Sequence, residues 1–205
     1  MFLEYAKRVI SVTDDALPEI RSGKVMKTLR IGCSNTIYEC HLGRELLDTM
    51  ADDTSYKITI GLSSDLNEKL QAGVFDVVYT FIPFRKKGFD CRLYHKDEMV
   101  LVTDYGNTAH KSMSRELLAG VDFVMCDFAL SDVGSFIRNI FPEHHRFAVE
   151  IDDCSKVPPF LMGRSCYAFL PREVASPYII DKKLREIKLN DIETPVIQSY
   201  VITRR

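Results

Sequence analysis

The sequence predicts a two-lobed α/β protein with a cleft between its lobes. Strand and helix patterns alternate over residues 28–81, extended segments without a helix follow at 89–104, and a second strand–helix series occupies the rest of the chain. Strands and helices that alternate with short crossovers are typical of parallel sheets covered by helices. Two such series joined by extended crossings therefore indicate two lobes.

The first lobe is predicted from residues 28–81. "TLRIGC" is an apolar strand, and residues 36–51 carry apolar side chains at helical spacing. "YKITIGL" alternates as a second strand, and "SSDLNEKLQAG" is a short helix with Ser63 or Ser64 as N-cap and Gly73 as its stop. "FDVVYTF" is a third strand, whose unbroken apolar character suits burial on both faces. Crossovers this short make the three strands parallel.

The second lobe is predicted from the remaining segments. "FDCRLYHKDEMVLVTD" holds two strands with no helix between them. Beyond it, "SRELLAG", "SDVGSFIRNIF" with Ser131 as cap, and the interrupted "SKVPPFLMG" are helical. Strands are expected at "VDFVMCD", "RFAVEI", "SCYAFLP" and the alternating "TPVIQSYVITRR".

An amphipathic helix is expected before Pro18. Its apolar positions follow a 3-4-3-4 spacing, the seam of a short coiled coil: Phe2, Tyr5, Val9, Val12 and Ala16. A helix of this length is marginal in water unless it is packed. It packs either on a partner or on its own domain, and the sequence leaves both interpretations open.

Composition excludes several classes of protein. A net charge of -2 argues against a chain that grips a nucleic-acid backbone unaided. No apolar run approaches the ~20 residues of a membrane span, and the charged N-terminus does not resemble a signal peptide. We therefore expect a cytoplasmic protein with no membrane partner. The six cysteines are scattered without a C-x-x-C pair, so free thiols are expected rather than a metal site.

The sequence carries no known catalytic motif. It has no G-x-S-x-G elbow, no P-loop and no G-x-G-x-x-G, so we expect binding without catalysis and without a cofactor. In open parallel sheets a ligand lies beyond the carboxyl ends of the strands, where helix N-termini converge. This rule selects Ser34, Asn35, Thr36, Ser63, Ser64, Thr80 and Phe81 in the first lobe, and Asp127, Phe128, Gly163 and Arg164 in the second.

Two interpretations of these polar residues remain open. Free amides and the positive end of a helix dipole suit a carboxylate, sulfate or phosphate group. Serine and threonine are also common helix caps, so a single one is explained by a purely structural role, whereas two at successive strand ends favour a binding site.

The order of these segments resembles the C-terminal effector-binding (regulatory) domain of a LysR-type transcriptional regulator. The resemblance rests on "GKVMKTLRIG", "LSSDLNEKLQAGVFDVVYTF", "LYHKDEMVLVTD", "MGRSCYAFLP" and "QSYVITRR", which span nearly the whole chain. It implies two Rossmann-like lobes with a central cleft, periplasmic-binding-protein-like (type 2), preceded by part of a linker helix. The expected division is 1–26 for linker and connector, 27–102 with 190–205 for lobe I, and 103–189 for lobe II.

The resemblance also implies partners and a mechanism. A small, anionic effector would bind between the lobes, at the residues selected above. The domains would form side-by-side homodimers, the full-length protein a tetramer, and DNA would be bound only by an N-terminal winged helix-turn-helix absent from this chain. The family's peroxide-sensing branch uses two cysteines in the first strand–helix loop of the second lobe, where this chain offers only Cys126, at the end of the strand. Redox sensing of that type is therefore not expected.

Other functions fit the same two-lobed pattern. A solute-binding protein of a transport system would carry a signal peptide, and an enzyme would carry a dense charged constellation in its cleft. A domain that has lost its ligand and acts only through dimerisation would have a collapsed, apolar cleft.

Overall fold

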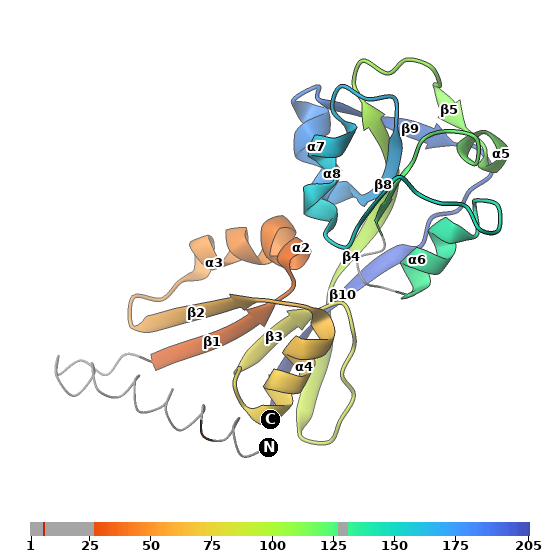
Figure 1. Cartoon of the computed structure of the whole chain (residues 1–205). Helices are drawn as coiled ribbons and strands as arrows, with labels where there is room; N and C mark the ends of the chain where they lie inside the picture. Colours follow the sequence, from red (N-terminus) through yellow and green to blue (C-terminus); the bar gives the residue numbers. More distant parts are fainter. Residues whose placement is uncertain (1–5, 7–26, 127–130) are drawn as a thin grey trace. The chain divides into compact units, whose positions relative to one another are not determined.

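A computed structural model of the chain describes residues 6, 27–126 and 131–205 (Figure 1). Most of the helix expected before Pro18, together with Asp127 and Phe128, lies outside the described residues. The chain forms two compact units, one running up to His95 and completed by Gln198–Arg205, the other Lys96–Ile197. The chain passes from one unit to the other between residues 95 and 96 and again between 197 and 198, each time within a long strand. The division expected from the sequence lay at 102/103 and 189/190.

The first unit is built on a mainly parallel sheet. Its strands are β1 (Lys27–Cys33), β2 (Thr54–Ile60), β3 (Val77–Thr80) and most of β10 (Val196–Arg204), in the order β2-β1-β3-β10. Strand β1 pairs in parallel with β2 and β3, and β10 pairs antiparallel with β3. The predicted three-stranded parallel set is therefore confirmed.

Helices cover both faces of this sheet. The segment after β1 forms α2 (Asn35–Ile37), the π-helical turn η1 (Tyr38–Leu42) and α3 (Gly43–Thr49), and α4 (Ser63–Ala72) follows β2. Because β2 and β3 flank β1 on opposite sides, right-handed crossovers place the two helical segments on opposite faces, as Figure 1 shows. The helix predicted over 36–51 is confirmed, but its middle turn is π-helical rather than α-helical.

Helix α4 ends as the sequence predicts and begins differently. Gly73 takes the left-handed conformation at φ 78°, which only glycine adopts without strain, and closes the last turn. The predicted cap at Ser63 or Ser64 is wrong, because Leu62 occupies the cap position and no side chain caps the helix. The Ser63 hydroxyl is instead engaged with neighbouring loops.

The core of the first unit lies between α4 and the sheet. Leu66, Leu70, Phe75, Val78 and Ile202 form one buried cluster. Gly32 on β1 is required here, since a Cβ at this position would lie 2.9 Å from both Leu66 Cδ2 and Phe75 Cδ2. The strand can approach the helix this closely only without a side chain.

The second unit is a mixed sheet with a small parallel addition. Its strands are the later part of β4 (Phe89–Asp104), β5 (Ser112–Met113), β6 (Val124–Cys126), β7 (Val149–Ile151), β8 (Tyr167–Pro171) and β9 (Leu184–Leu189). Strand β4 pairs antiparallel with β8 and β9, whereas β6 and β7 pair in parallel. The expectation of two strands over 89–104 is wrong: β4 is one continuous strand, long enough to pass from one unit to the other.

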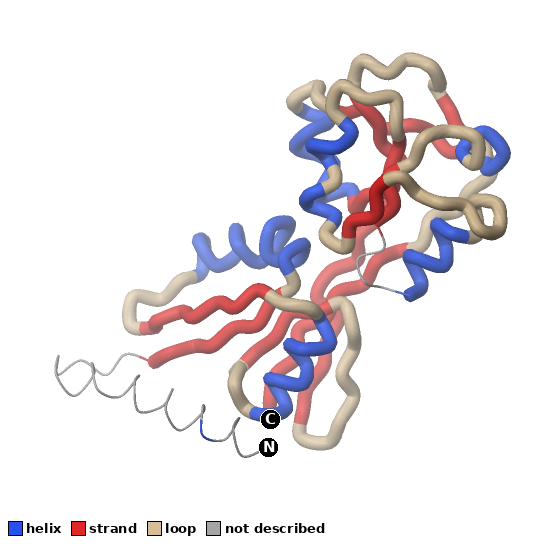
Figure 2. Tube along the Cα trace, in the orientation of Figure 1, coloured by secondary structure: helices blue, strands red, loops and turns tan. Residues whose placement is uncertain are grey.

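The helices of the second unit are short (Figure 2). They are α5 (Arg115–Leu118), α6 (Ser131–Arg138), the 3-10 turn η2 (Cys154–Lys156), α7 (Pro158–Leu161) and α8 (Arg172–Ile180). The broken helix around Pro158 is confirmed, and α6 starts at Ser131, the residue expected to cap it. Helix α8 and strand β9 were not predicted. Pro177 inside α8 reads as a helix breaker in the sequence.

Candidate functional site

Two serines meet at the carboxyl ends of the first unit's strands. Ser34 follows β1 and Ser63 follows β2, and their Oγ atoms lie 3.1 Å apart. The Ser34 amide donates to the carbonyl of Tyr79 on β3 (3.1 Å), so this junction is fixed to the neighbouring strand. The sheet therefore brings together two residues that the strand-end rule selected separately.

The end of β3 completes this polar cluster. The Phe81 amide donates to Ser63 Oγ (3.2 Å), and the Ile82 amide donates to Thr80 Oγ1 (3.1 Å). Thr80 is fully buried, and the Phe81 side chain is 9% exposed. Both hydroxyls therefore serve to hold the turn after β3.

Asn67 is a member of the cluster that the sequence analysis missed. Its Nδ2 donates to the Ile82 carbonyl at 3.0 Å, while its Oδ1 is buried and has no hydrogen-bond partner among the residues that the structure describes. Asn67 is four residues after Ser63, so both lie on the same face of α4. A polar residue placed between Leu66 and Leu70 on the buried face was the available signal.

One of the two hydroxyl hydrogens of the serine pair has no acceptor among the described residues. Each hydroxyl carries one hydrogen, and Ser63 Oγ already accepts from the Phe81 amide. Whichever serine donates across the 3.1 Å contact, the other hydroxyl keeps its own hydrogen for a further acceptor. Ser34 is 7% exposed and Ser63 is half-buried, so this donor suits an oxygen of a small bound group.

The remaining first-lobe candidates lie around this pair. Thr36 is buried in the first turn after Ser34, and Asn35 Nδ2 donates to Glu39 Oε1 at 3.2 Å. Ser64 is exposed and its hydroxyl donates to Asp65 at 3.4 Å, so it takes no part in the cluster. Ser34 occupies the N-cap position of α2 but makes no side-chain capping bond.

The second-lobe candidates are placed differently from the expectation. Asp127 and Phe128 lie outside the described residues. Gly163 and Arg164 precede β8 instead of following a strand, because β8 runs parallel to β6 through the bridge between Phe123 and Tyr167. The Gly163 amide donates to Asp104 Oδ1 (2.7 Å). Asp104 is the last residue of β4, whereas the chain enters the second unit at Lys96, near the middle of that strand. The strand-end rule was therefore misapplied to these two residues.

A second polar network surrounds Glu45 on α3. Tyr94 Oη donates to Glu45 Oε2 (2.6 Å), His95 Nε2 lies 3.2 Å from Glu45 Oε1, and the ring of His41 stacks on His95 at 3.9 Å. Burial raises the pKa of Glu45, but these hydrogen bonds and the nearby imidazoles outweigh it and leave the pKa below its usual value. Burial, then Glu45 itself, raises the pKa of Tyr94. No local sequence pattern marks this network.

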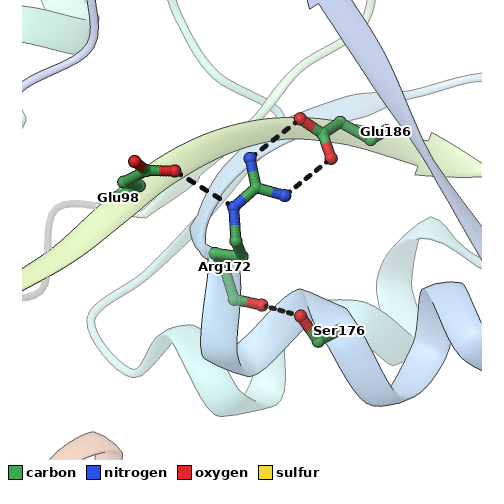
Figure 3. A network of polar contacts seen from close by, with 4 residues as sticks. All are labelled: Glu98, Arg172, Ser176 and Glu186. Carbon is green, nitrogen blue, oxygen red and sulfur yellow. Dashed lines mark hydrogen bonds and ion pairs between the residues drawn. The ribbon is translucent and has the colours of Figure 1, made fainter.

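A half-exposed arginine links three elements of the second unit (Figure 3). Arg172 binds Glu186 through two hydrogen bonds of 2.9 and 3.1 Å, and its Nε donates to Glu98 at 3.2 Å. These bonds tie the start of α8 to β4 and β9, and the bond with Glu186 foremost raises the pKa of Arg172. A cavity of about 610 Å³ borders this network, where the guanidinium is already satisfied.

All six cysteines are free thiols, as expected. Among the residues that the structure describes, no three His, Cys, Asp or Glu side chains are grouped to hold a metal ion. No helix in that part of the chain is long and apolar enough to cross a membrane.

Comparison with known proteins identifies the family. Residues 22–205 match the model of the LysR substrate binding domain. The chain belongs to this family. As a LysR substrate binding domain it is a domain of transcription regulators, and its two-lobed, type 2 periplasmic-binding-like fold is the one expected.

Solved structures of regulatory domains have the same fold as this LysR substrate binding domain. It resembles the reduced OxyR regulatory domain from Pseudomonas aeruginosa, with TM-score 0.69, 16% identity and 88% of each chain covered. The regulatory domain of MexT, a transcriptional activator in Pseudomonas aeruginosa, gives TM-score 0.68 and 15% identity over 86% of this chain and 89% of that one. Full-length CbnR complexed with target DNA gives TM-score 0.68 and 17% identity, over 100% of this chain and 73% of that one. No curated protein sequence matches.

Proposed function

We propose that this LysR substrate binding domain senses a small anionic effector through the polar cluster of Ser34, Ser63, Thr80 and the Phe81 amide. The single observation that supports the proposal is the serine pair, because one of its two hydroxyl hydrogens has no acceptor within the described residues. A carboxylate, sulfate or phosphate oxygen is the acceptor that suits it.

The chemistry of the cluster favours binding over catalysis. The hydrogen that the cluster offers belongs to a neutral hydroxyl, which can bind an anion without burying a compensating charge. Asn67 Oδ1, buried without a partner, adds an acceptor for a donor group of the same ligand. We infer a regulator rather than an enzyme, acting in the cytoplasm with DNA as the partner of the parent protein.

The effector would act by changing populations of conformations. A ligand shifts an equilibrium only as far as it prefers one of the two states. Ser34 is fixed to Tyr79 on β3, and Ser63 is fixed to the turn after β3. A ligand at the serine pair would therefore contact three strand ends at once and stabilise one arrangement of them.

Isothermal titration calorimetry with small carboxylates and oxyanions tests the site. Ser34→Ala leaves the Phe81 amide paired with Ser63 but removes the hydroxyl that orients the Ser63 hydroxyl, so we expect an affinity loss of about tenfold. Ser64→Ala is the matched control and should leave affinity unchanged. Equal affinity in all three proteins would place the effector elsewhere.

We also propose a homodimer through the first unit. Strand β2 lies at the edge of the sheet, next to β1. Large apolar side chains are exposed on α3, on β2 and just after each of them: Leu47, Met50, Ile58, Ile60 and Leu62. Exposed apolar edges mark interaction surfaces. In sedimentation, Leu47→Glu with Ile60→Glu should give monomers, whereas Leu93→Glu, at a separate exposed leucine of β4, should not. A wild-type monomer at high concentration would overturn the proposal.

A further inference from the structure

A second cavity lies within the second unit, at the amino-terminal edge of its parallel strands. Its volume is about 490 Å³, within the range of small-molecule sites. Its wall comes from the residues that precede β6, β7 and β8, among them Asp122, Arg146 and Arg164. The carboxyl end of β6, where Asp127 was expected to bind the effector, is the opposite edge.

The charged groups of this wall are unpaired. The guanidinium groups of Arg146 and Arg164 form no hydrogen bond or ion pair with any residue in the described part of the chain, and neither does the Asp122 carboxylate. Two guanidinium groups against one carboxylate leave one net positive charge. A singly charged anion would neutralise it, and a guanidinium pairs with a carboxylate through two parallel hydrogen bonds.

The floor of the cavity is apolar. Phe123 and Cys166 are buried, and Phe160 is 39% exposed. An inorganic anion would leave this surface in contact with water, whereas a ligand with an aromatic or aliphatic body would cover it. The wall therefore favours a charged head joined to an apolar body.

The backbone that carries the two arginines is held in place before any ligand arrives. Asp104 anchors the turn that presents Arg164, accepting from the Gly163 amide (2.7 Å) and the Gly106 amide (2.8 Å). On the other side, the His145 ring stacks on Phe141 with centroids 4.7 Å apart and meets Phe147 edge-on at 4.7 Å. A preformed wall loses little entropy when a ligand binds.

The larger cavity beside Arg172 lacks these properties. Its guanidinium is saturated by Glu98 and Glu186, so no free cationic fork faces a ligand there. Lys188 contributes a single ammonium to that wall, and it forms no hydrogen bond or ion pair with the described residues. The cavity at Arg146 and Arg164 is therefore the candidate ligand site, and the cavity beside Arg172 serves as the control.

We propose that the cavity at Arg146 and Arg164 is a second ligand site of this domain, selective for a singly charged organic carboxylate with an apolar body. It is separate from the proposed effector cluster of the first unit and does not depend on it. A domain with both sites could respond to two ligands.

Calorimetric titration of the chain with benzoate at low ionic strength tests the site. We expect saturable binding that benzyl alcohol, which lacks the charge, and sulfate, which lacks the apolar body, do not reproduce. Arg146→Gln and Arg164→Gln should each lower the benzoate affinity about tenfold, the usual cost of a lost hydrogen bond to a charged group. Lys188→Gln should leave it unchanged.

Two further variants separate charge from shape. Asp122→Asn removes the carboxylate that opposes the anion and should strengthen binding, while Ala148→Trp should fill the cavity and abolish it. Both positions are exposed, so folding is preserved. Benzoate that does not bind, or binds equally well to both arginine variants, overturns the site. Binding lost in Ser34→Ala but kept in the arginine variants assigns benzoate to the first unit and also overturns it.

Discussion

The hydroxyls of Ser34 and Ser63 lie 3.1 Å apart, although 29 residues of sequence separate them. Each follows a strand of the same parallel sheet, and the sheet register brings the two strand ends together: Cys33 pairs with Ile60. The contact answers the question that the two serines raise in the sequence. Neither caps its helix through its side chain, and the two hydroxyls contact each other instead.

Replacing Ser63 with alanine should destabilise the first unit. The substitution leaves the Phe81 amide without its acceptor at a nearly buried position, and an unsatisfied group of this kind costs about 1–2 kcal/mol. Urea unfolding measures the change. Ser64→Ala, an exposed neighbour, should stay within about 0.5 kcal/mol of the wild type. An equal loss in both variants would contradict the role given to Ser63.

Gly32→Ala should destabilise the protein because it overpacks the core. The new Cβ would lie 2.9 Å from side-chain atoms of both Leu66 and Phe75, and overpacking of this kind costs about 1–3 kcal/mol. Gly120→Ala is the matched control, since a Cβ there meets only an ordinary contact at 3.6 Å. Thermal unfolding that shifts equally in the two variants would show that the core relaxes around the extra methyl group.

Glu45 should make the stability of the first unit depend on acid pH. Its pKa in the folded protein lies below its usual value of 4.5, so its stabilising contribution is complete above pH 4.5 and is lost as pH falls through the lowered value. The Glu45→Gln variant should therefore lose less stability than the wild type between neutral pH and the acid range. The carboxylate is 47% exposed, so solvent keeps the effect modest.

The control for Glu45 lies in the same unit. Glu68 on α4 is exposed and forms no hydrogen bond or ion pair with the described residues. Glu68→Gln should retain the wild-type dependence of unfolding free energy on pH. If Glu45→Gln and the wild type lose stability in parallel, the network of Tyr94 and His95 does not act on this carboxylate.

The thiols should react in two groups. Cys40 and Cys91 are half-buried, whereas Cys33, Cys126, Cys154 and Cys166 are buried, and burial raises the pKa of Cys33 and of Cys166. Only thiolate reacts, so iodoacetamide followed by mass spectrometry should label Cys40 and Cys91 first in the folded chain. All six should react at similar rates in urea. Early labelling of Cys33 would indicate an opening of the first unit.

The sequence predicted the serine cluster more completely than the rest of the site. Thr80 is the last residue of a strand, and Ser34, Ser63 and Phe81 lie just beyond strand ends, so periodicity and the strand-end rule found these residues together. Asn67 and the network around Glu45 depend on which helix face meets which strand, and that is decided by packing. Gly163 and Arg164 were misplaced because the rule needs the strand direction relative to its neighbours, which only the pairing of β8 provides.

The fold was predictable where local pattern and tertiary pairing agree. Strands β1, β2 and β3 are apolar or alternating and are separated by helices of ordinary composition. Strand β4 changes from exposed to buried partway along its length, which divides one strand into two in the sequence pattern. Helix α8 contains Pro177, and its start is fixed by Arg172 bonds to Glu98 and Glu186, partners that no local pattern reveals.

The route of β10 has a consequence for biosynthesis. Ile202 is fully buried in the core of the first unit, and Tyr200–Thr203 pair with β3, yet this segment is translated after the whole of Lys96–Ile197. The part of the domain that leaves the ribosome first is therefore the last to be completed. On the nascent chain, β3 waits with one side unpaired while the intervening residues emerge, a period of several seconds at about 5–20 residues per second. The first unit can therefore reach its final packing only after the second unit has been synthesised.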